Sequence, residues 1–142
     1  MKKLLVSDVG LYSTTKNRES EKMMKCILQI LKKKSLKPEN LIITDGTGGN
    51  GTDTIAFAPV FKKVNMVELD PLHCKIIKNN IRVYRLTSKV NFQCPADYVK
   101  KAFRLKQDII FLDPPWGGTD YKRENKIRLF LGKTDVVDLV ND

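Results

Sequence analysis

Residues 41–51 read Leu-Ile-Ile-Thr-Asp-Gly-Thr-Gly-Gly-Asn-Gly, a short apolar run that ends in an acid and a glycine-rich turn. A buried parallel strand gives such an uninterrupted apolar run, and glycines in the following turn let the backbone approach a ligand closely. The spacing is not the Gly-x-Gly-x-x-Gly of dinucleotide-binding folds, because Gly48, Gly49 and Gly51 are packed differently. Taken alone, the turn is equally consistent with a plain connection between a strand and a helix.

Strands and helices alternate after this stretch. Asp70 and Pro71 are typical of an N-cap followed by proline at the first helical position. Such alternation predicts an α/β fold with a parallel, doubly wound sheet. The expected strands are 41–44, 64–67, 90–92 and 109–112, and the expected helices are 52–58, 71–84 and 98–103.

A further amphipathic helix is expected before the first strand, because positions 23, 26, 27, 30 and 31 are apolar at helical spacing and Pro38 ends the element. A chain of 142 residues is long enough for one core and too short for two. We expect a single domain over 1–142, with an extension and helix in 1–38 and the core in 39–142.

Residues 109–118 read Ile-Ile-Phe-Leu-Asp-Pro-Pro-Trp-Gly-Gly, which predicts a buried strand followed by a rigid loop. The prolines remove backbone donors and leave carbonyls free to accept hydrogen bonds. Asp113 adds an acceptor, and Trp116 adds a flat apolar face that suits stacking on a base rather than the alternative, a place in the core. This set of groups suits methylation of an amino group on a nucleobase.

Acids also follow the second and third expected strands. Glu68 is placed to hold two ribose hydroxyls, although alone it would be interpreted as a surface acid or capping partner. Asp97 is placed to accept from an adenine amino group, and it is equally suited to cap the next helix. Together with the glycine turn, these acids describe an adenosine-bearing ligand over the C-terminal ends of the strands.

The net charge of +10, from 26 Lys+Arg against 16 Asp+Glu, favours a polyanion such as a nucleic acid as partner. For each basic cluster taken singly, a solvated face is the alternative. The last cluster differs because it follows the Pro-Pro-Trp loop directly. The clusters are 32–34 with Lys37, 62–63, 100–101 with Arg104 and Lys106, and Lys122-Arg123 with Lys126 and Arg128.

Three cysteines without metal-ligand spacing, Cys26, Cys74 and Cys94, are expected to be reduced core thiols. His73 is expected to face solvent on its helix, and no metal site is expected. There is no apolar run of membrane-spanning length and no signal peptide, so we expect no membrane partner and a cytoplasmic location, or a nuclear one in a eukaryote.

With these residues in view, the chain resembles the class I S-adenosylmethionine-dependent methyltransferases, and most closely the trimethylguanosine synthase family of RNA cap guanine-N2 methyltransferases. The resemblance covers about residues 12–121. It rests on the turn 45–55, on Glu68-Leu69-Asp70-Pro71 with 79–80 and 83–84, and on the Pro-Pro-Trp-Gly-Gly element with Tyr121. The Pro-Pro-Trp-Gly-Gly element is the specific one. The resemblance implies a Rossmann-like fold, S-adenosylmethionine as cofactor and capped RNA as partner.

The resemblance also implies roles for single residues. Trp116 would stack on the methylated guanine of a cap, while Asp113 and the Pro114 carbonyl would face its amino group. These three are the predicted catalytic residues. The predicted cofactor-binding residues are Asp45, Thr47, Gly49, Gly51, Thr54, Glu68, Asp97 and Asp113, and the predicted substrate-binding residues are Pro115, Trp116, Gly117, Tyr121, Lys122 and Arg123.

Two departures from the family pattern leave other functions open. Asp113 stands where many members have serine, which is closer to the Asp/Asn-Pro-Pro-aromatic motif of nucleobase amino methyltransferases, and Thr52-Asp53 replace a Gly-Asn pair. Methylation of ribosomal RNA or DNA is therefore an alternative. The expected sheet ends with strand 109–112 as an apolar edge, which indicates the N-terminal part of a larger domain completed by missing strands or by another chain. A catalytically incomplete module that binds RNA or a partner is the second alternative.

Overall fold

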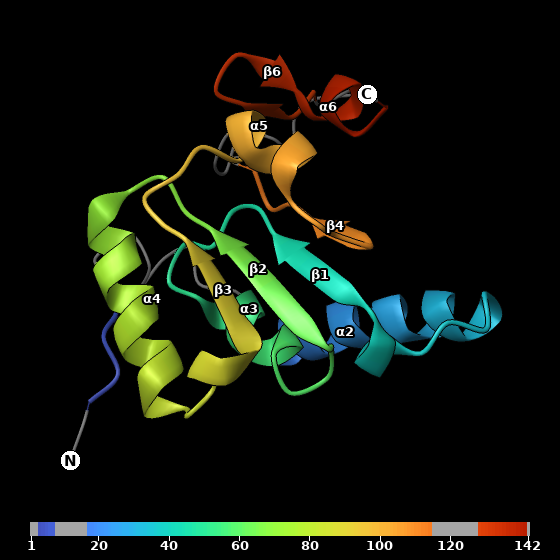
Figure 1. The fold of residues 1–142 in the computed structure, drawn as a ribbon, viewed down its shortest axis with the longest axis horizontal. Coiled ribbons are helices and arrows are strands. Elements are labelled where there is room, and N and C mark those ends of the chain that lie inside the picture. Colours follow the sequence, from blue (N-terminus) through green and yellow to red (C-terminus); the bar gives the residue numbers. More distant parts are fainter. Residues whose placement is uncertain (1–2, 8–16, 115–127, 142) are drawn as a thin grey trace. The chain divides into compact units, whose positions relative to one another are not determined.

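The computed structural model describes residues 3–7, 17–114 and 128–141 (Figure 1). The chain divides into a first unit, Met1–Phe111, and a second unit, Leu112–Asp142. Four parallel strands form the sheet of the first unit in the order β3-β2-β1-β4. They are β1 (Ile42–Asp45), β2 (Lys63–Val67), β3 (Val90–Gln93) and β4 (Ile109–Phe111). The predicted α/β class and Rossmann-like arrangement are confirmed.

One face of the sheet carries the core. Ile43 pairs in register with Val64 on one side and with Ile109 on the other, and Val64 pairs with Val90. Because side chains alternate between faces along a strand, this register places the four apolar residues on the same face. Phe57 and Phe61 pack into the same cluster, with their rings edge to face at 6.0 Å between centroids.

Three helices cover this core and lie close to the predicted positions. They are α2 (Asn17–Lys33), α3 (Thr52–Phe57) and α4 (Pro71–Val83), and in Figure 1 α2 and α3 lie behind the sheet. The Asp70 side chain accepts from the backbone N–H of Leu72 at 2.7 Å, so the predicted N-cap is confirmed. Short 3-10 helices η1 (Pro38–Asn40) and η2 (Thr87–Lys89) precede β1 and β3.

The opposite face is covered much less by the elements of the first unit. The predicted helix at 98–103 is only one turn long as α5 (Tyr98–Lys101), and the 3-10 helix η3 (Ala102–Arg104) follows it. In Figure 1 the front of β1, β2 and β3 has no helix of this unit across it. The apolar run 109–112 predicts a buried strand, whereas β4 is an edge of the described sheet and Ile110 stays 38% exposed. The reason is that no described strand pairs with its outer side.

The N-terminal segment at residues 3–7 is fastened to α4 through one amide side chain. Asn80 accepts from the Leu5 backbone N–H at 2.9 Å and donates to the Leu5 carbonyl at 2.8 Å. Asn80 is only 5% exposed and lies on the stripe of α4 that also buries Ile76, Ile77 and Ile81. Both polar ends of the amide are therefore satisfied by backbone atoms 75 residues away in the sequence.

The second unit contains a small hairpin and a helix. Strands β5 (Phe130–Leu131) and β6 (Thr134–Asp135) pair antiparallel, and α6 (Val136–Asn141) follows them. Gly132 has φ +62 in the hairpin turn. The Asp135 carboxylate accepts from Arg128 Nε and from the Val137 backbone N–H, so one acid fixes both the hairpin and the start of the helix. Among the described residues, no helix has the length and apolarity needed to cross a membrane.

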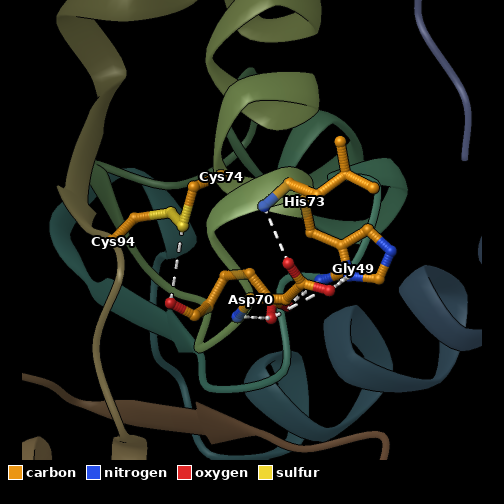
Figure 2. The surroundings of a disulfide bond; sticks show 7 residues. Gly49, Asp70, His73, Cys74 and Cys94 are labelled. Atoms are coloured by element: carbon orange, nitrogen blue, oxygen red, sulfur yellow. Dashed lines mark hydrogen bonds and ion pairs between the residues drawn. A yellow bond between two sulfur atoms is a disulfide. The ribbon is translucent and has the colours of Figure 1, made fainter.

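The expectation of three reduced core cysteines is wrong. Cys74 in α4 and Cys94 after β3 form a disulfide with Cα atoms 5.7 Å apart (Figure 2). Cys26 is exposed on α2. Parallel strands β2 and β3 bring the two cysteines together from positions 20 residues apart. Sequence spacing could not show this, because the pairing depends on where the helix returns to the sheet.

The disulfide predicts a reductant-sensitive stability. Closing a loop of 20 residues restricts the unfolded chain, so reduction should lower the free energy of unfolding by about 3 kcal/mol. Urea unfolding with and without a phosphine reductant measures this difference. The double variant Cys74→Ser/Cys94→Ser is the control and should not respond to reductant. Identical unfolding midpoints for the oxidised and reduced native protein would contradict the prediction.

Candidate functional site

Glu68 joins the two loops that follow β1 and β2. Its Oε2 accepts from the Gly49 backbone N–H at 2.7 Å, and its Oε1 accepts from the Asp70 backbone N–H at 2.7 Å (Figure 2). Each carboxylate oxygen can accept a second hydrogen bond, so both remain able to bind hydroxyl groups of a ligand. The acid predicted from its position at a strand end is therefore held in a fixed orientation by main-chain donors.

The glycines beside Glu68 are required by close packing and by backbone conformation. A Cβ on Gly48 would lie 2.8 Å from Met66 Sδ, and a Cβ on Gly51 would lie 3.2 Å from Ile77 Cγ1. Gly49 and Gly51 have φ values of +51 and +85, in the left-handed region that favours glycine. The turn thus packs closely against β2 and α4 at the C-terminal edge of the sheet.

Asp45 is the last residue of β1, and its side chain forms hydrogen bonds to the same turn and to the helix that follows it. It is 1% exposed, and its carboxylate accepts from Thr54 Oγ1 at 2.5 Å and from the Thr47 backbone N–H at 3.3 Å. Burial raises the pKa of Asp45 from its ordinary value of 3.8 to about 7. Three of the predicted cofactor-binding residues, Asp45, Thr47 and Thr54, therefore form one hydrogen-bonded group inside the turn.

The loop after β3 lies beside the loop that carries Glu68. The Glu68 carbonyl accepts from the Ala96 backbone N–H at 2.7 Å, and the Glu68 backbone N–H donates to the Gln93 carbonyl at 3.2 Å. Asp97 accepts from the Val99 backbone N–H at 3.0 Å, so it caps α5 as one of its two expected roles requires. The structure thus brings the glycine turn, Glu68 and the Asp97 loop to one edge of the sheet.

A polar link joins the N-terminal segment to this edge, and it was not expected from the sequence. Ser7 Oγ lies 3.1 Å from His73 Nε2 and 3.3 Å from Asn50 Oδ1. His73 Nδ1 lies 4.0 Å from Glu68 Oε1 and 3.9 Å from Asp70 Oδ2 (Figure 2). The expectation that His73 faces solvent is wrong, because its side chain is only 19% exposed among these groups. The position of His73 in the first turn after the Asp70-Pro71 cap is the one feature of the sequence that indicates this partly buried environment.

Strand β4, which the Pro-Pro-Trp segment follows in the sequence, ends next to the glycine turn. Phe111 of β4 pairs with Asp45, and its carbonyl accepts from the Gly46 backbone N–H at 3.0 Å. Asp113 and Pro114 follow in the second unit, where Pro114 is buried and Asp113 is exposed. Neighbouring atoms still desolvate the Asp113 carboxyl enough to raise its pKa above the ordinary value. The remaining predicted residues lie outside the described residues: Pro115, Trp116, Gly117, Tyr121, Lys122 and Arg123.

Two further features adjoin this edge. An apolar cavity of about 610 Å³ lies between residues 4–6, α2 and α3, and it reaches Asn50 and Thr52 of the glycine turn. Within the described ranges, no group of three His, Cys, Asp or Glu side chains is arranged to hold a metal ion. The polar groups at the edge include the Glu68 and Asp97 carboxylates, which accept hydrogen bonds and so suit a ligand with hydroxyl and amino groups.

The buried Asp45 predicts a pH-dependent stability. With its pKa raised to about 7, the folded protein holds this proton more tightly than the unfolded chain. Asp45 therefore contributes stability that is full below about pH 4 and is lost as the pH rises through 7, at about 1.4 kcal/mol per pH unit at most. In urea unfolding from pH 4 to 8, the free energy of unfolding of Asp45→Asn should rise relative to that of the native protein as the pH increases. The control is Asp138→Asn, a change at an exposed acid. If the free energies of unfolding of Asp45→Asn and the native protein differed by the same amount at every pH, the effect would be refuted.

Comparison with known proteins agrees with this geometry. The model of a family described as RNA cap guanine-N2 methyltransferase matches residues 40–140. Protein L320 of Acanthamoeba polyphaga mimivirus, which is uncharacterised, is 37% identical over 110 residues, covering 75% of this chain and 42% of that protein. Trimethylguanosine synthase of Schizosaccharomyces pombe is 30% identical over 115 residues, covering 78% of this chain and 45% of the synthase.

A solved structure shows the same fold at low identity. Precorrin-6y C5,15-methyltransferase of Geobacter metallireducens GS-15 superposes with a TM-score of 0.58 and 17% identity, covering 82% of this chain and 56% of that one. The chain spans less than half the length of the two curated relatives. The family model matches residues 40–140, which include all four strands of the parallel sheet and extend into α6. The chain therefore belongs to the RNA cap guanine-N2 methyltransferase family.

Proposed function

We propose that the protein transfers a methyl group from S-adenosylmethionine to the exocyclic N2 amino group of guanine in a 7-methylguanosine RNA cap. The observation that carries the proposal is Glu68, held by Gly49 and Asp70 at the C-terminal edge of the sheet. In open α/β folds, ligands bind at this edge, and an acid at the end of the second strand holds ribose hydroxyls. Membership of the family supports the guanine substrate.

The residues present fit S-adenosylmethionine. Glu68 would hold the ribose hydroxyls, because both its oxygens keep accepting capacity while their orientation is fixed. Asp97 would accept from the adenine amino group through Oδ2, since capping of α5 uses Oδ1 and the ammonium near Oδ2, that of the exposed Lys100, lies 3.9 Å away. The turn with Gly49 and Gly51 would surround the methionine part, where backbone without Cβ atoms allows close approach.

The sulfonium of this cofactor would supply the methyl group, and this chain would supply alignment. Asp113 and the Pro114 carbonyl would accept hydrogen bonds from the guanine amino group and direct its lone pair along the line of displacement. Trp116 would hold the base by stacking on the positively charged 7-methylguanine ring. No strong general base is needed, because the amine loses its proton after the methyl group has arrived.

One observation favours a second candidate substrate. Asp113 stands where many family members have serine, and an acid in that position resembles the motif of enzymes that methylate other nucleobase amino groups. A carboxylate accepts hydrogen bonds more strongly than a hydroxyl, so it would suit an adenine or cytosine amino group as well as guanine. The substrate comparison below separates the two candidates.

Loss of the Glu68 carboxylate should weaken cofactor binding. In Glu68→Gln, an amide N–H₂ replaces one acceptor and faces the N–H of Gly49 or Asp70, so both a ribose contact and the anchoring of the turn are lost. We expect the affinity for S-adenosylhomocysteine to fall at least about tenfold, the cost of one charge-assisted hydrogen bond. Isothermal titration measures it, with the exposed Glu39→Gln as control. Equal affinities for both variants would exclude Glu68 from the cofactor site.

The Pro-Pro-Trp loop should be essential for methyl transfer. Asp113→Ala and Trp116→Ala are expected to lower turnover about 100-fold or more, because each removes a group that positions the base. The assay follows radiolabelled methyl transfer to 7-methylguanosine-capped RNA, to unmethylated capped RNA and to an adenine-bearing oligonucleotide. Asp138→Ala controls for loss of an exposed acid in the second unit. Near-normal turnover by either loop variant would refute this active site, and preference for the oligonucleotide would support the second candidate.

A further inference from the structure

We propose that a basic groove in the first unit, on the sheet face opposite the core, binds the phosphate backbone of the RNA substrate, with most of its lining away from the methyl-transfer edge. The site is a cavity of about 570 Å³ at the start of β1, β2 and β3, which we call the amide groove. The residues that carry the argument are Asn65, Asn91, Lys63, Lys101, Arg104 and Lys106, all of which line it. The choice of RNA as the polyanion rests on the proposed function.

The floor of the groove is a row of polar side chains across three strands. Thr44, Asn65 and Asn91 are paired in register, so they lie side by side on the face opposite the core. Asn91 Nδ2 donates to Asn65 Oδ1 at 3.0 Å, and Asn65 Nδ2 donates to Thr44 Oγ1 at 3.1 Å and to the Lys106 carbonyl at 2.9 Å. The row fixes Asn65, which is 5% exposed, and leaves Asn91 at the surface.

Four cations surround this floor, and no acid lines the cavity among the described residues. Lys63 comes from the start of β2, Lys101 from the end of α5, and Arg104 and Lys106 from the segment that leads to β4. Across the described ranges, none of the four takes part in a salt bridge. The Lys63 ammonium donates to the Ser88 carbonyl, but it too has no carboxylate partner in the part of the chain that the structure describes. Cations without carboxylate partners on a concave surface raise the local concentration of a polyanion and release counterions when it binds.

The composition of the groove argues against coverage by an ordinary helix. A helix packed on a sheet presents an apolar stripe, whereas this face offers amides and ammonium groups that would lose their water without gaining partners. A nucleic-acid strand satisfies both sets of groups. Phosphates accept from lysine and arginine, and the exposed Asn91 amide can bond to a base edge or a ribose hydroxyl.

Most of the groove lies toward the N-terminal ends of the strands, away from the cofactor site, although Gln93 at the end of β3 also lines it. Lys63 and Val90 begin their strands, whereas Asp45 and Glu68 stand at the C-terminal ends. A strand of four or five residues separates the two ends by roughly 15 Å. The groove would therefore contact nucleotides several positions away from the methylated base, and its loss should affect long RNA but not a minimal cap.

The experiment compares two triple variants of equal charge. Lys101→Gln/Arg104→Gln/Lys106→Gln neutralises the groove, and Lys32→Gln/Lys33→Gln/Lys34→Gln neutralises exposed lysines at the end of α2. Fluorescence anisotropy measures binding to a capped RNA of about 12 nucleotides, a length suited to single-strand sites. A cap dinucleotide, a polyglutamate peptide and S-adenosylhomocysteine are titrated in parallel. A third variant, Lys101→Arg/Arg104→Lys/Lys106→Arg, keeps the charge.

We expect the groove variant to bind the capped RNA about tenfold more weakly, with a salt slope smaller by about 2, while the α2 variant changes less than about twofold. Affinity for the dinucleotide and for S-adenosylhomocysteine should stay unchanged, which shows that the fold and cofactor site are intact. The charge-preserving variant should bind RNA normally. The proposal would be overturned if both triple variants lost the same affinity for the capped RNA, or if neither lost any. It would also be overturned if the groove variant lost affinity for polyglutamate alone. Failure of the methyl-transfer assay with RNA binding intact would instead count against the proposed function.

Discussion

The Glu68 carboxylate is the constraint on which the arrangement of the site depends. The carboxylate accepts from the backbone N–H of Gly49 in the turn after β1 and from that of Asp70 in the loop after β2. The main-chain carbonyl of Glu68 accepts from the backbone N–H of Ala96 after β3. One residue thus fixes three loops that arise from three different strands. A flexible turn of several glycines would otherwise lose much conformational entropy on binding a ligand. The hydrogen bonds of Glu68 remove part of that cost before any ligand arrives.

The same edge concentrates groups that are unfavourable elsewhere in the fold. Asp45 is buried next to Thr54, and burial raises its pKa to about 7, so its charged form is destabilised at the end of β1. The glycines of the turn have left-handed conformations or leave no room for a Cβ. These costs are offset by the core on the helical face, where Ile43, Val64 and Met66 are fully buried. Stability and the candidate site are therefore supplied by different faces and ends of one sheet.

Local features could be predicted from the sequence, and pairings distant in sequence could not. The strand ends, the Asp70 cap and the glycine turn depend on neighbouring residues, and the structure places them within a residue or two of the predicted positions. The Cys74–Cys94 disulfide and the contact of Ser7 with His73 depend on how α4 and the N-terminal segment return to the sheet. Asn80 carried a weak signal, because an amide within the apolar stripe of a helix needs polar partners from elsewhere.

The distribution of charge gives the two ends of the sheet different roles. The C-terminal edge carries Glu68 and Asp97, which suit the hydroxyl and amino groups of a small ligand but would repel a phosphate backbone. The opposite end carries Lys63, Arg104 and Lys106, which attract that backbone. On the proposed function, a protein with a net charge of +10 would bind an adenosine-bearing cofactor at one end of the sheet and RNA at the other, and this separation would keep the polyanion from competing for the cofactor edge. Orientation of the RNA would follow from electrostatics before any base is recognised.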